Sequence, residues 1–171
     1  GSEMCIRDSF NTSDIDYTAL KQLVGRSVQV KEDIVEQDPF EHGIRKALNL
    51  GHTVGHAFES MALAENRPVL HGYAVAWGIV CELYLSHLKV GFPKEKMRQT
   101  IQFIKDNYGV FTFDCKKYEQ LYAFMTHDKK NTSGTINFTL LKDIGDIRIN
   151  QIADKDTIFE MLDFYRECMG I

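Results

Sequence analysis

Apolar residues recur at helical spacing along most of this chain. At roughly 100° per residue, such positions fall on one face of a helix that packs against a core. Ser13 or Asp14 is expected to cap the first helix, and Asp38-Pro39 to end it. The pattern predicts helices over residues 13–37, 41–64, 73–88, 94–107, 115–127 and 154–168.

The spacing of apolar residues changes to two in residues 135–141, Thr-Ile-Asn-Phe-Thr-Leu-Leu. Alternation of this kind is typical of a half-buried strand. Residues 144–146, Ile-Gly-Asp, are expected to turn the chain, and residues 147–149 to form a short second strand. The predicted fold class is therefore mainly α, a multi-helical domain with one small β-hairpin.

The segment 41–64 carries an unusual set of polar side chains. Arg45, Asn49, His52 and His56 are spaced by four, three and four residues. On one continuous helix they would fall within an arc of about 60°, and Glu41 would join them one turn earlier. A guanidinium, an amide and two imidazoles on one face predict a site for an anionic, hydroxyl-rich ligand and a metal.

Two glycines, Gly51 and Gly55, interrupt the same segment four residues apart. Each costs about 1 kcal/mol relative to alanine inside a helix. We therefore expect another backbone or a ligand to approach the helix closely at these positions.

The histidines leave two interpretations open. His52 and His56, at i and i+4, are spaced to clamp one metal, or they are ordinary polar positions of a helix. His71 is expected at the start of helix 73–88, where the helix dipole favours neutral imidazole, the form that binds metals. The residues alone identify no further ligand. We interpret the remaining histidines as surface or hydrogen-bonded positions: His42, His87 and His127.

Two lysine positions also have two interpretations. Lys31 lies on the apolar stripe of its own helix. In one interpretation its side chain extends from the edge of the stripe towards water, and in the other its ammonium group points into a binding site. Lys129 stands beside Lys130 in a polar loop, which is either a solvated turn or a phosphate contact.

Composition narrows the function classes. The 171 residues are 44% hydrophobic and 26% charged, with a net charge of -4. This balance argues against a nucleic-acid or anionic-membrane surface, and the sequence has no apolar run long enough to span a membrane. Four widely spaced cysteines indicate reduced thiols in a cytoplasmic protein. Residues 1–9 match no pattern that follows and are interpreted as a tag or foreign leader, leaving 10–171 as the domain.

Residues 48–59, Leu-Asn-Leu-Gly-His-Thr-Val-Gly-His-Ala-Phe-Glu, closely resemble the 3-dehydroquinate synthase family. Supporting stretches follow in the family's order over residues 28–165: 70–78 (Leu-His-Gly-Tyr-Ala-Val-Ala-Trp-Gly), 128–131 (Asp-Lys-Lys-Asn) and 138–145 (Phe-Thr-Leu-Leu-Lys-Asp-Ile-Gly). The resemblance covers only the family's C-terminal helical domain. It implies that an N-terminal NAD-binding domain lies outside this sequence.

The resemblance also implies roles for individual residues. His52 and His71 would be metal ligands, joined by a glutamate that precedes this sequence. His56 would take part in proton transfer, with Glu41 as a second acid/base candidate. Contacts to the anionic substrate would come from Lys31, Arg45, Asn49 and Lys129. One departure is that the family usually has His-Gly-Glu where this chain has His71-Gly72-Tyr73, which bears on the surroundings of His71.

The implied enzyme is a phosphate-eliminating lyase of the shikimate pathway, which leads to the aromatic amino acids. It converts 3-deoxy-D-arabino-heptulosonate 7-phosphate to 3-dehydroquinate and phosphate, using zinc or cobalt and NAD. The full-length protein would be a cytoplasmic homodimer, and the isolated domain would be inactive.

Two other enzyme classes are also compatible with these residues. Another sugar-phosphate cyclase would keep the metal histidines and differ in its pocket residues. An iron-type alcohol or glycerol dehydrogenase has a similar architecture, but a small neutral alcohol would not need Arg45, Asn49 and Lys31.

Overall fold

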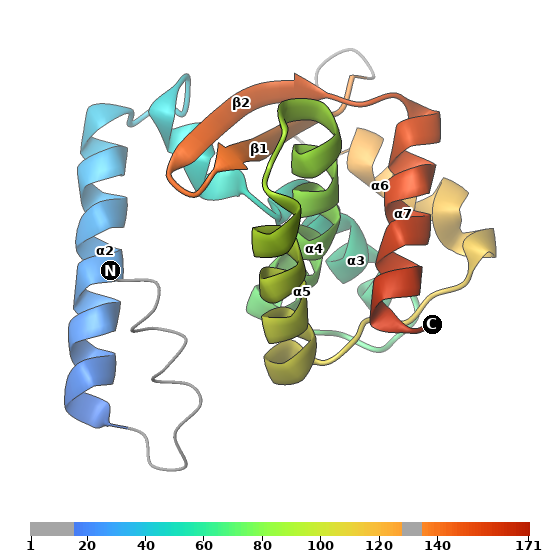
Figure 1. Cartoon of the computed structure of the whole chain (residues 1–171), viewed down its shortest axis with the longest axis horizontal. Coiled ribbons are helices and arrows are strands. Elements are labelled where there is room, and N and C mark those ends of the chain that lie inside the picture. The colour runs from blue at the N-terminus through green and yellow to red at the C-terminus, as the bar shows by residue number, and fades with distance from the viewer. Residues whose placement is uncertain (1–15, 128–134) are drawn as a thin grey trace. The chain divides into compact units, whose positions relative to one another are not determined.

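The computed structural model describes residues 16–127 and 135–171 of the chain (Figure 1). It is mainly helical with one two-stranded antiparallel sheet, which confirms the predicted fold class. Its elements are α2 (Tyr17–Gln37), η1 (Ile44–Asn49), α3 (His52–Ala64), α4 (His71–Val90), α5 (Lys94–Tyr108), η2 (Cys115–Lys117), α6 (Tyr118–Thr126), β1 (Asn137–Asp143), β2 (Asp146–Ile152) and α7 (Lys155–Met169).

The chain forms two compact units, with the boundary between Leu48 and Asn49. In the first unit, α2 begins one residue after Asp16, whose carboxylate accepts hydrogen bonds from the backbone N–H groups of Thr18 and Ala19. The predicted cap at Ser13 or Asp14 was therefore wrong. Asp16 is preferred because its side chain satisfies two of the N–H groups that a helix start leaves without partners. The helix ends at Gln37, before Asp38-Pro39, as predicted.

The predicted continuous helix over residues 41–64 was also wrong. A 3-10 helix, η1, precedes α3, and Gly51 between them has a φ of 78°, outside the range of a right-handed helix. Glu41 has a φ of 58° and likewise lies outside a helix. Arg45 and Asn49 therefore do not share a helical face with the histidines, and the 60° arc does not exist.

Helix α4 is the central element of the second unit. It packs against α3, α5, α7 and β1, as the arrangement in Figure 1 shows. It begins at His71, two residues before the predicted start, and ends at Val90, because the C-cap Gly91 has a φ of 82° that stops the helix. Its residues are apolar on most sides because neighbouring elements surround it.

Three glycines let α3 and α4 touch through their backbones. A methyl group added at Gly78 would lie 2.1 Å from the carbonyl oxygen of Gly51 and 2.6 Å from the backbone nitrogen of Gly55. One added at Gly55 would lie 2.9 Å from the carbonyl oxygen of Ala74. The close approach that the glycines predicted is confirmed, and the approaching backbone is that of α4.

A buried carboxylate completes this contact. Glu82, one turn beyond Gly78 on α4, has no exposed surface. It accepts hydrogen bonds from the backbone nitrogens of Gly51, at 2.6 Å, and Val54, at 3.2 Å. Because Gly51 offers no capping side chain, the side-chain oxygens of Glu82 accept the hydrogen bonds of these N–H groups at the start of α3 instead.

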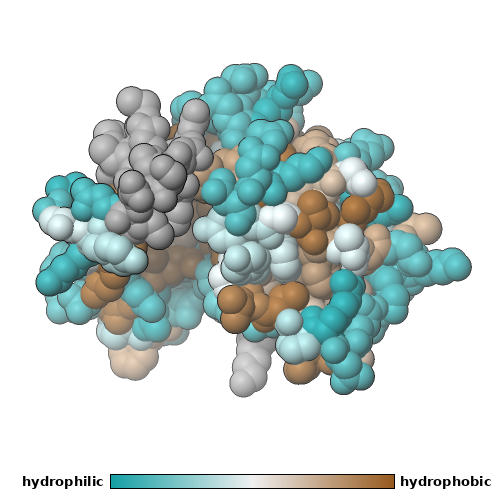
Figure 2. Space-filling model, turned by 90° about the horizontal axis from the view of Figure 1, so that it is seen from below, coloured by the Kyte–Doolittle hydropathy of each residue, from teal (hydrophilic) through white to brown (hydrophobic). Residues whose placement is uncertain are grey.

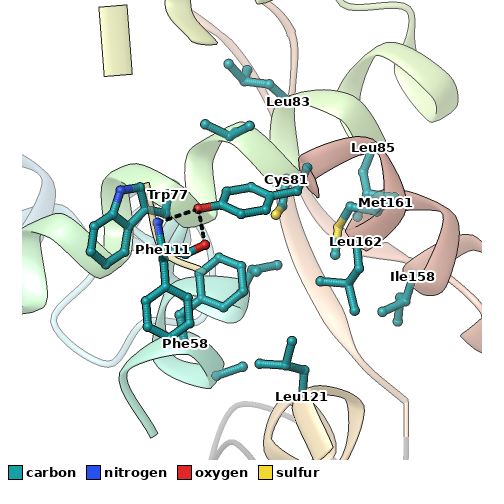
Figure 3. Close-up of a cluster of buried hydrophobic side chains, with 14 of the residues drawn as sticks. Phe58, Trp77, Cys81, Leu83, Leu85, Phe111, Leu121, Ile158, Met161 and Leu162 are labelled. Atoms are coloured by element: carbon teal, nitrogen blue, oxygen red, sulfur yellow. Dashed lines mark hydrogen bonds between the residues drawn. The ribbon is translucent and has the colours of Figure 1, made fainter. Parts of the chain in front are cut away.

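Aromatic rings from distant segments fill the core beneath α3 (Figure 3). Phe58 of α3 lies with its ring centroid 5.1 Å from that of Phe111 and 5.3 Å from that of Tyr165 on α7. The hydroxyl of Tyr165 accepts a hydrogen bond from the backbone nitrogen of Phe111 and donates one to its carbonyl oxygen. Burial raises the pKa of Tyr165, so this phenol stays neutral. The inward face of α7 consists of Ile158, Met161, Leu162 and Tyr165, all of which are buried.

The predicted β-hairpin is confirmed, although β1 begins and ends two residues later than predicted and β2 is longer than the predicted 147–149. Asn137 pairs with Ile152, and Asp143 pairs with Asp146 across the turn. The backbone nitrogen of Leu141 donates to the hydroxyl of Ser86 on α4, which holds β1 against the central helix.

At the surface, hydrophobic side chains stand as separate patches among hydrophilic ones on the face that Figure 2 displays. Within residues 16–127 and 135–171, none of the helices has the length and apolar character needed to cross a membrane.

The α3–α4 contact can be tested with two alanine substitutions on one helix. We expect Gly78→Ala to lower the free energy of unfolding by about 2–3 kcal/mol, since the new methyl must push two backbones apart. Gly72→Ala is the matched control, because a methyl there meets no atom within 4 Å, and it should be neutral or stabilise by up to about 1 kcal/mol. Urea unfolding of both variants measures the difference. Equal midpoints would contradict the backbone contact.

Candidate metal and substrate site

Helix α3 separates its core residues from its polar ones. Val54, Phe58 and Met61 are fully buried, whereas His52 and His56 are only partly covered. This division follows from the helical period, since residues four apart share a face. His71, the first residue of α4, is exposed.

The imidazole rings of His52, His56 and His71 lie together. The ring centroids are 5.4 Å apart for His52 and His71, 5.5 Å for His52 and His56, and 5.6 Å for His56 and His71. Within the described ranges, however, no group of three or more His, Cys, Asp or Glu residues is arranged to hold a metal ion. The part of the chain described here thus provides an imidazole cluster and not a complete ligand set.

Two of these rings are oriented by hydrogen bonds at Nδ1. The Nδ1 of His52 lies 3.1 Å from the carbonyl oxygen of Leu50, and the Nδ1 of His71 lies 3.0 Å from Oε2 of Glu59. A carbonyl oxygen and an ionised carboxylate can only accept hydrogen bonds, so Nδ1 carries the proton whenever either ring is in its neutral form. Nε2 is then the nitrogen with the lone pair, as a metal-binding imidazole requires.

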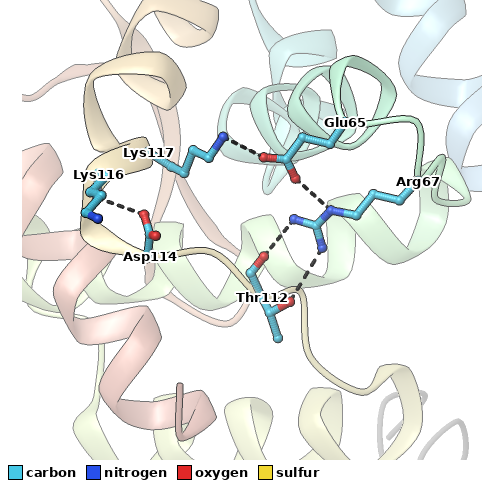
Figure 4. A network of polar contacts seen from close by, with 6 residues as sticks. All are labelled: Glu65, Arg67, Thr112, Asp114, Lys116 and Lys117. Carbon is cyan, nitrogen blue, oxygen red and sulfur yellow. Dashed lines mark hydrogen bonds and ion pairs between the residues drawn. The ribbon is translucent and has the colours of Figure 1, made fainter.

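The loop between α3 and α4 is held in place by a polar network (Figure 4). Arg67 donates to the carbonyl oxygen of Thr112 at 2.7 Å and pairs with Glu65 at 2.7 Å. Lys117 pairs with the other oxygen of Glu65 at 2.8 Å. These cations, Lys117 first, lower the pKa of Glu65, which therefore remains a carboxylate. The network fixes the path of the chain into His71.

Arg45 and Glu41 belong to the first unit. A loop around Asp38 positions Arg45: the carboxylate of Asp38 accepts hydrogen bonds from the backbone nitrogens of Gly43, at 2.7 Å, and Arg45, at 3.1 Å. The bond from Gly43 is the main cause of a lowered pKa for Asp38. The guanidinium of Arg45 donates to the carbonyl oxygen of Pro39.

The other predicted substrate contacts come from separate segments of the chain. Lys31 is exposed on α2, and Asn49 is half-buried at the end of η1. Lys129 lies outside the described residues. The roles of all these residues stay predictions.

Tyr73, the departure from the family pattern, packs as an aromatic residue. Its ring centroid lies 5.9 Å from that of Trp77 and 5.3 Å from that of Tyr108 on α5, both edge-on. The residue therefore contributes to the packing of α4 against α5.

The three histidines interpreted as surface or hydrogen-bonded positions are confirmed as such. Nδ1 of His87 bonds the carbonyl oxygen of Phe92, and Nδ1 of His127 bonds that of Ala123. His42 is exposed, and its backbone nitrogen donates to Asp38.

Sequence reasoning missed Glu59 as part of this cluster. The signal was present, because Glu59 follows His56 by three residues and His52 by seven, and so shares their face of α3. Glu82 was missed for a different reason. A carboxylate in an apolar helix gives no local indication that it caps another helix 31 residues earlier.

The 3-dehydroquinate synthase C-terminal family model matches residues 4–131. A 3-dehydroquinate synthase of Parabacteroides distasonis is 60% identical over 162 residues, covering 95% of this chain and 46% of that protein. One of Leptospira interrogans is 43% identical over 147 residues, covering 83% of this chain and 40% of that protein. The chain thus spans less than half the length of these relatives.

Among solved structures, 2-deoxy-scyllo-inosose synthase in complex with carbaglucose-6-phosphate, NAD+ and Co2+ has a similar fold. The TM-score is 0.69 at 17% identity, over 97% of this chain and 50% of that one. The motif that carries the histidines, the helical fold and the matches to relatives agree. This chain belongs to the 3-dehydroquinate synthase C-terminal family.

Proposed function

We propose that this chain is the metal- and substrate-binding part of a 3-dehydroquinate synthase. The full-length protein would convert 3-deoxy-D-arabino-heptulosonate 7-phosphate to 3-dehydroquinate and phosphate, as a cytoplasmic homodimer. Support comes from the family membership and from a relative that is 60% identical and named for this activity. Because the chain covers 46% of that relative, we expect the chain alone to be inactive.

The observation that carries the proposal is the pairing of His52 with His71. Their rings lie 5.4 Å apart, and the Nδ1 of each faces an acceptor. Two zinc–nitrogen bonds of about 2 Å each span such a separation when both rings turn Nε2 inwards. The donor set thus fits two ligands of a zinc or cobalt ion, with a glutamate from outside this chain as the third.

Both cofactors would be shared with the rest of the protein. When bound, the metal would act as a Lewis acid that polarises the oxygen on the carbon being oxidised. NAD would be bound mainly by an N-terminal domain outside this chain, which is then the chain's principal partner. The described chain contributes the imidazoles that hold the metal and the side chains that hold the substrate.

The remaining predicted residues have roles that suit an anionic sugar phosphate. Arg45 would hold an anionic group of the substrate through two parallel hydrogen bonds, and Asn49 would hold its hydroxyl or carboxylate oxygens. Lys31 and Lys129 would neutralise phosphate charge. His56 would move a proton at the phosphate side of the substrate, with Glu41 as a second acid or base.

A second candidate is another sugar-phosphate cyclase. The solved neighbour supports only the shared fold, because its identity is 17%. The relatives named 3-dehydroquinate synthase, at 60% and 43%, favour the first proposal. Turnover of the seven-carbon acidic substrate by the full-length protein, compared with a hexose phosphate that lacks the carboxylate, decides between them.

Substitution of each histidine in the full-length protein separates ligand from proton-transfer roles. We expect His52→Ala and His71→Ala to lose bound zinc and at least about 100-fold of phosphate release, since each removes a metal ligand. His56→Ala should keep its zinc and lose about 100- to 10,000-fold of turnover. Metal content and phosphate release are measured together, with His87→Ala as control. Zinc loss in His56→Ala would show that His56 is a ligand instead.

The 171-residue chain itself should bind zinc weakly and NAD not at all. Two imidazoles without a carboxylate leave the metal under-coordinated, and the sequence carries no dinucleotide-binding glycine motif. Calorimetric titration of the chain with each ligand measures this. Tight binding of NAD would contradict the proposed division of labour.

Arg45→Lys in the full-length protein tests the substrate contact. A lysine keeps the charge but loses the planar fork. We expect a loss of about 2–4 kcal/mol of transition-state binding, or roughly 30- to 1,000-fold in kcat/KM. Stability should change little, and Arg148→Lys, at an exposed position on β2, is the control. If activity falls only as far as folded protein does, the bond from Arg45 to Pro39 is its main role.

A further inference from the structure

Glu59 lies on α3, and its side chain links this helix to α4, the other helix that carries a histidine of the cluster. From the half-exposed face of α3 its Oε2 reaches the Nδ1 of His71 on α4, at 3.0 Å. The Glu59 side chain is 39% exposed and that of His71 is 53% exposed. The contact therefore joins two partly exposed side chains that lie outside the hydrophobic core.

The two histidines are oriented by different kinds of acceptor. His52 uses a backbone carbonyl two residues away, which its own helix start fixes. His71 depends on a side chain from another helix, twelve residues earlier in the chain. A carboxylate on Nδ1–H fixes the tautomer and the ring orientation more strongly than a neutral acceptor, and it makes Nε2 a better electron donor.

We infer that Glu59 is a positioning residue that holds His71 as the Nδ1–H tautomer, with Nε2 directed to a divalent metal. This inference rests on the proposed function. Glu59 acts through His71 and makes no bond to the metal or the substrate. This chain has Tyr73 where the family pattern usually has a glutamate, and Tyr73 packs against Trp77 and Tyr108. The carboxylate that contacts His71 is that of Glu59 on α3.

A purely structural role predicts a different result. If the pair only joined α3 to α4, its loss would lower stability and leave the tautomer of His71 unchanged. The crossing of these helices is already fixed by the glycine contact and by buried Glu82. A half-exposed hydrogen bond between two side chains adds little to that, so the fold of a Glu59 variant should survive.

The test uses the 171-residue chain, with zinc as the probe. We expect Glu59→Ala to weaken zinc affinity about 10- to 100-fold in chelator competition, and Glu59→Gln to weaken it less because its amide oxygen still accepts. In metal-free samples at about pH 8, where imidazole is neutral, nitrogen-15 NMR should show His71 shifting from the Nδ1–H form to a mixture of tautomers. The melting temperature should stay within about 2 °C.

Matched variants separate the ways in which this can fail. Glu119→Gln removes the carboxylate of another helical ion pair, with Lys155, and should change neither zinc affinity nor the His71 tautomer. If His71→Ala binds zinc as tightly as the parent, the proposed metal role fails. If His71→Ala loses zinc but Glu59→Ala retains full affinity or an unchanged His71 tautomer, the inference about Glu59 alone is overturned.

Discussion

The backbone contact between α3 and α4 determines where the imidazoles of His52 and His71 lie. Gly51 and Gly78 bring the helices so close that no side chain fits between them, and Glu82 caps the start of α3 from the neighbouring helix. His52 is the first residue of one helix and His71 the first residue of the other. A small rotation at the crossing would move both rings, so the geometry of the cluster depends on this packing. A buried carboxylate at a helix start is favourable because backbone N–H groups and the helix dipole compensate its charge.

Helix α3 keeps stability and chemistry on separate faces. Its buried face, centred on Phe58, packs into an aromatic core that reaches α7 through Tyr165. Its other face carries two imidazoles and a carboxylate, which are partly exposed and lie outside the hydrophobic core. Close packing of the buried face makes the helix rigid, and a rigid helix holds polar side chains at fixed distances, which a site of charged ligands requires.

The candidate metal site is incomplete among the described residues of a chain that spans less than half the length of its relatives. This chain holds an imidazole cluster without a complete ligand set among its described residues, and it spans 46% of a relative named 3-dehydroquinate synthase. Under the proposed function, the missing ligand and the NAD-binding domain come from the remaining half. A site divided in this way is completed only when both parts are present, so full metal affinity and activity are linked to assembly of the whole protein.

The sequence by itself determined most helices of the second unit and the hairpin, and it marked His52, His56 and His71 as candidates for a site, because the period of apolar residues and the family motif are local patterns. Tertiary structure decided the rest. The helix predicted over 41–64 breaks at Gly51, which has a positive φ and no room for a Cβ beside α4. Arg45 therefore does not share a helix with the histidines, and no periodicity argument could have located the break. The bond from Glu59 to His71 likewise arises only when α3 meets α4, since contacts between helices depend on packing that sequence spacing does not encode.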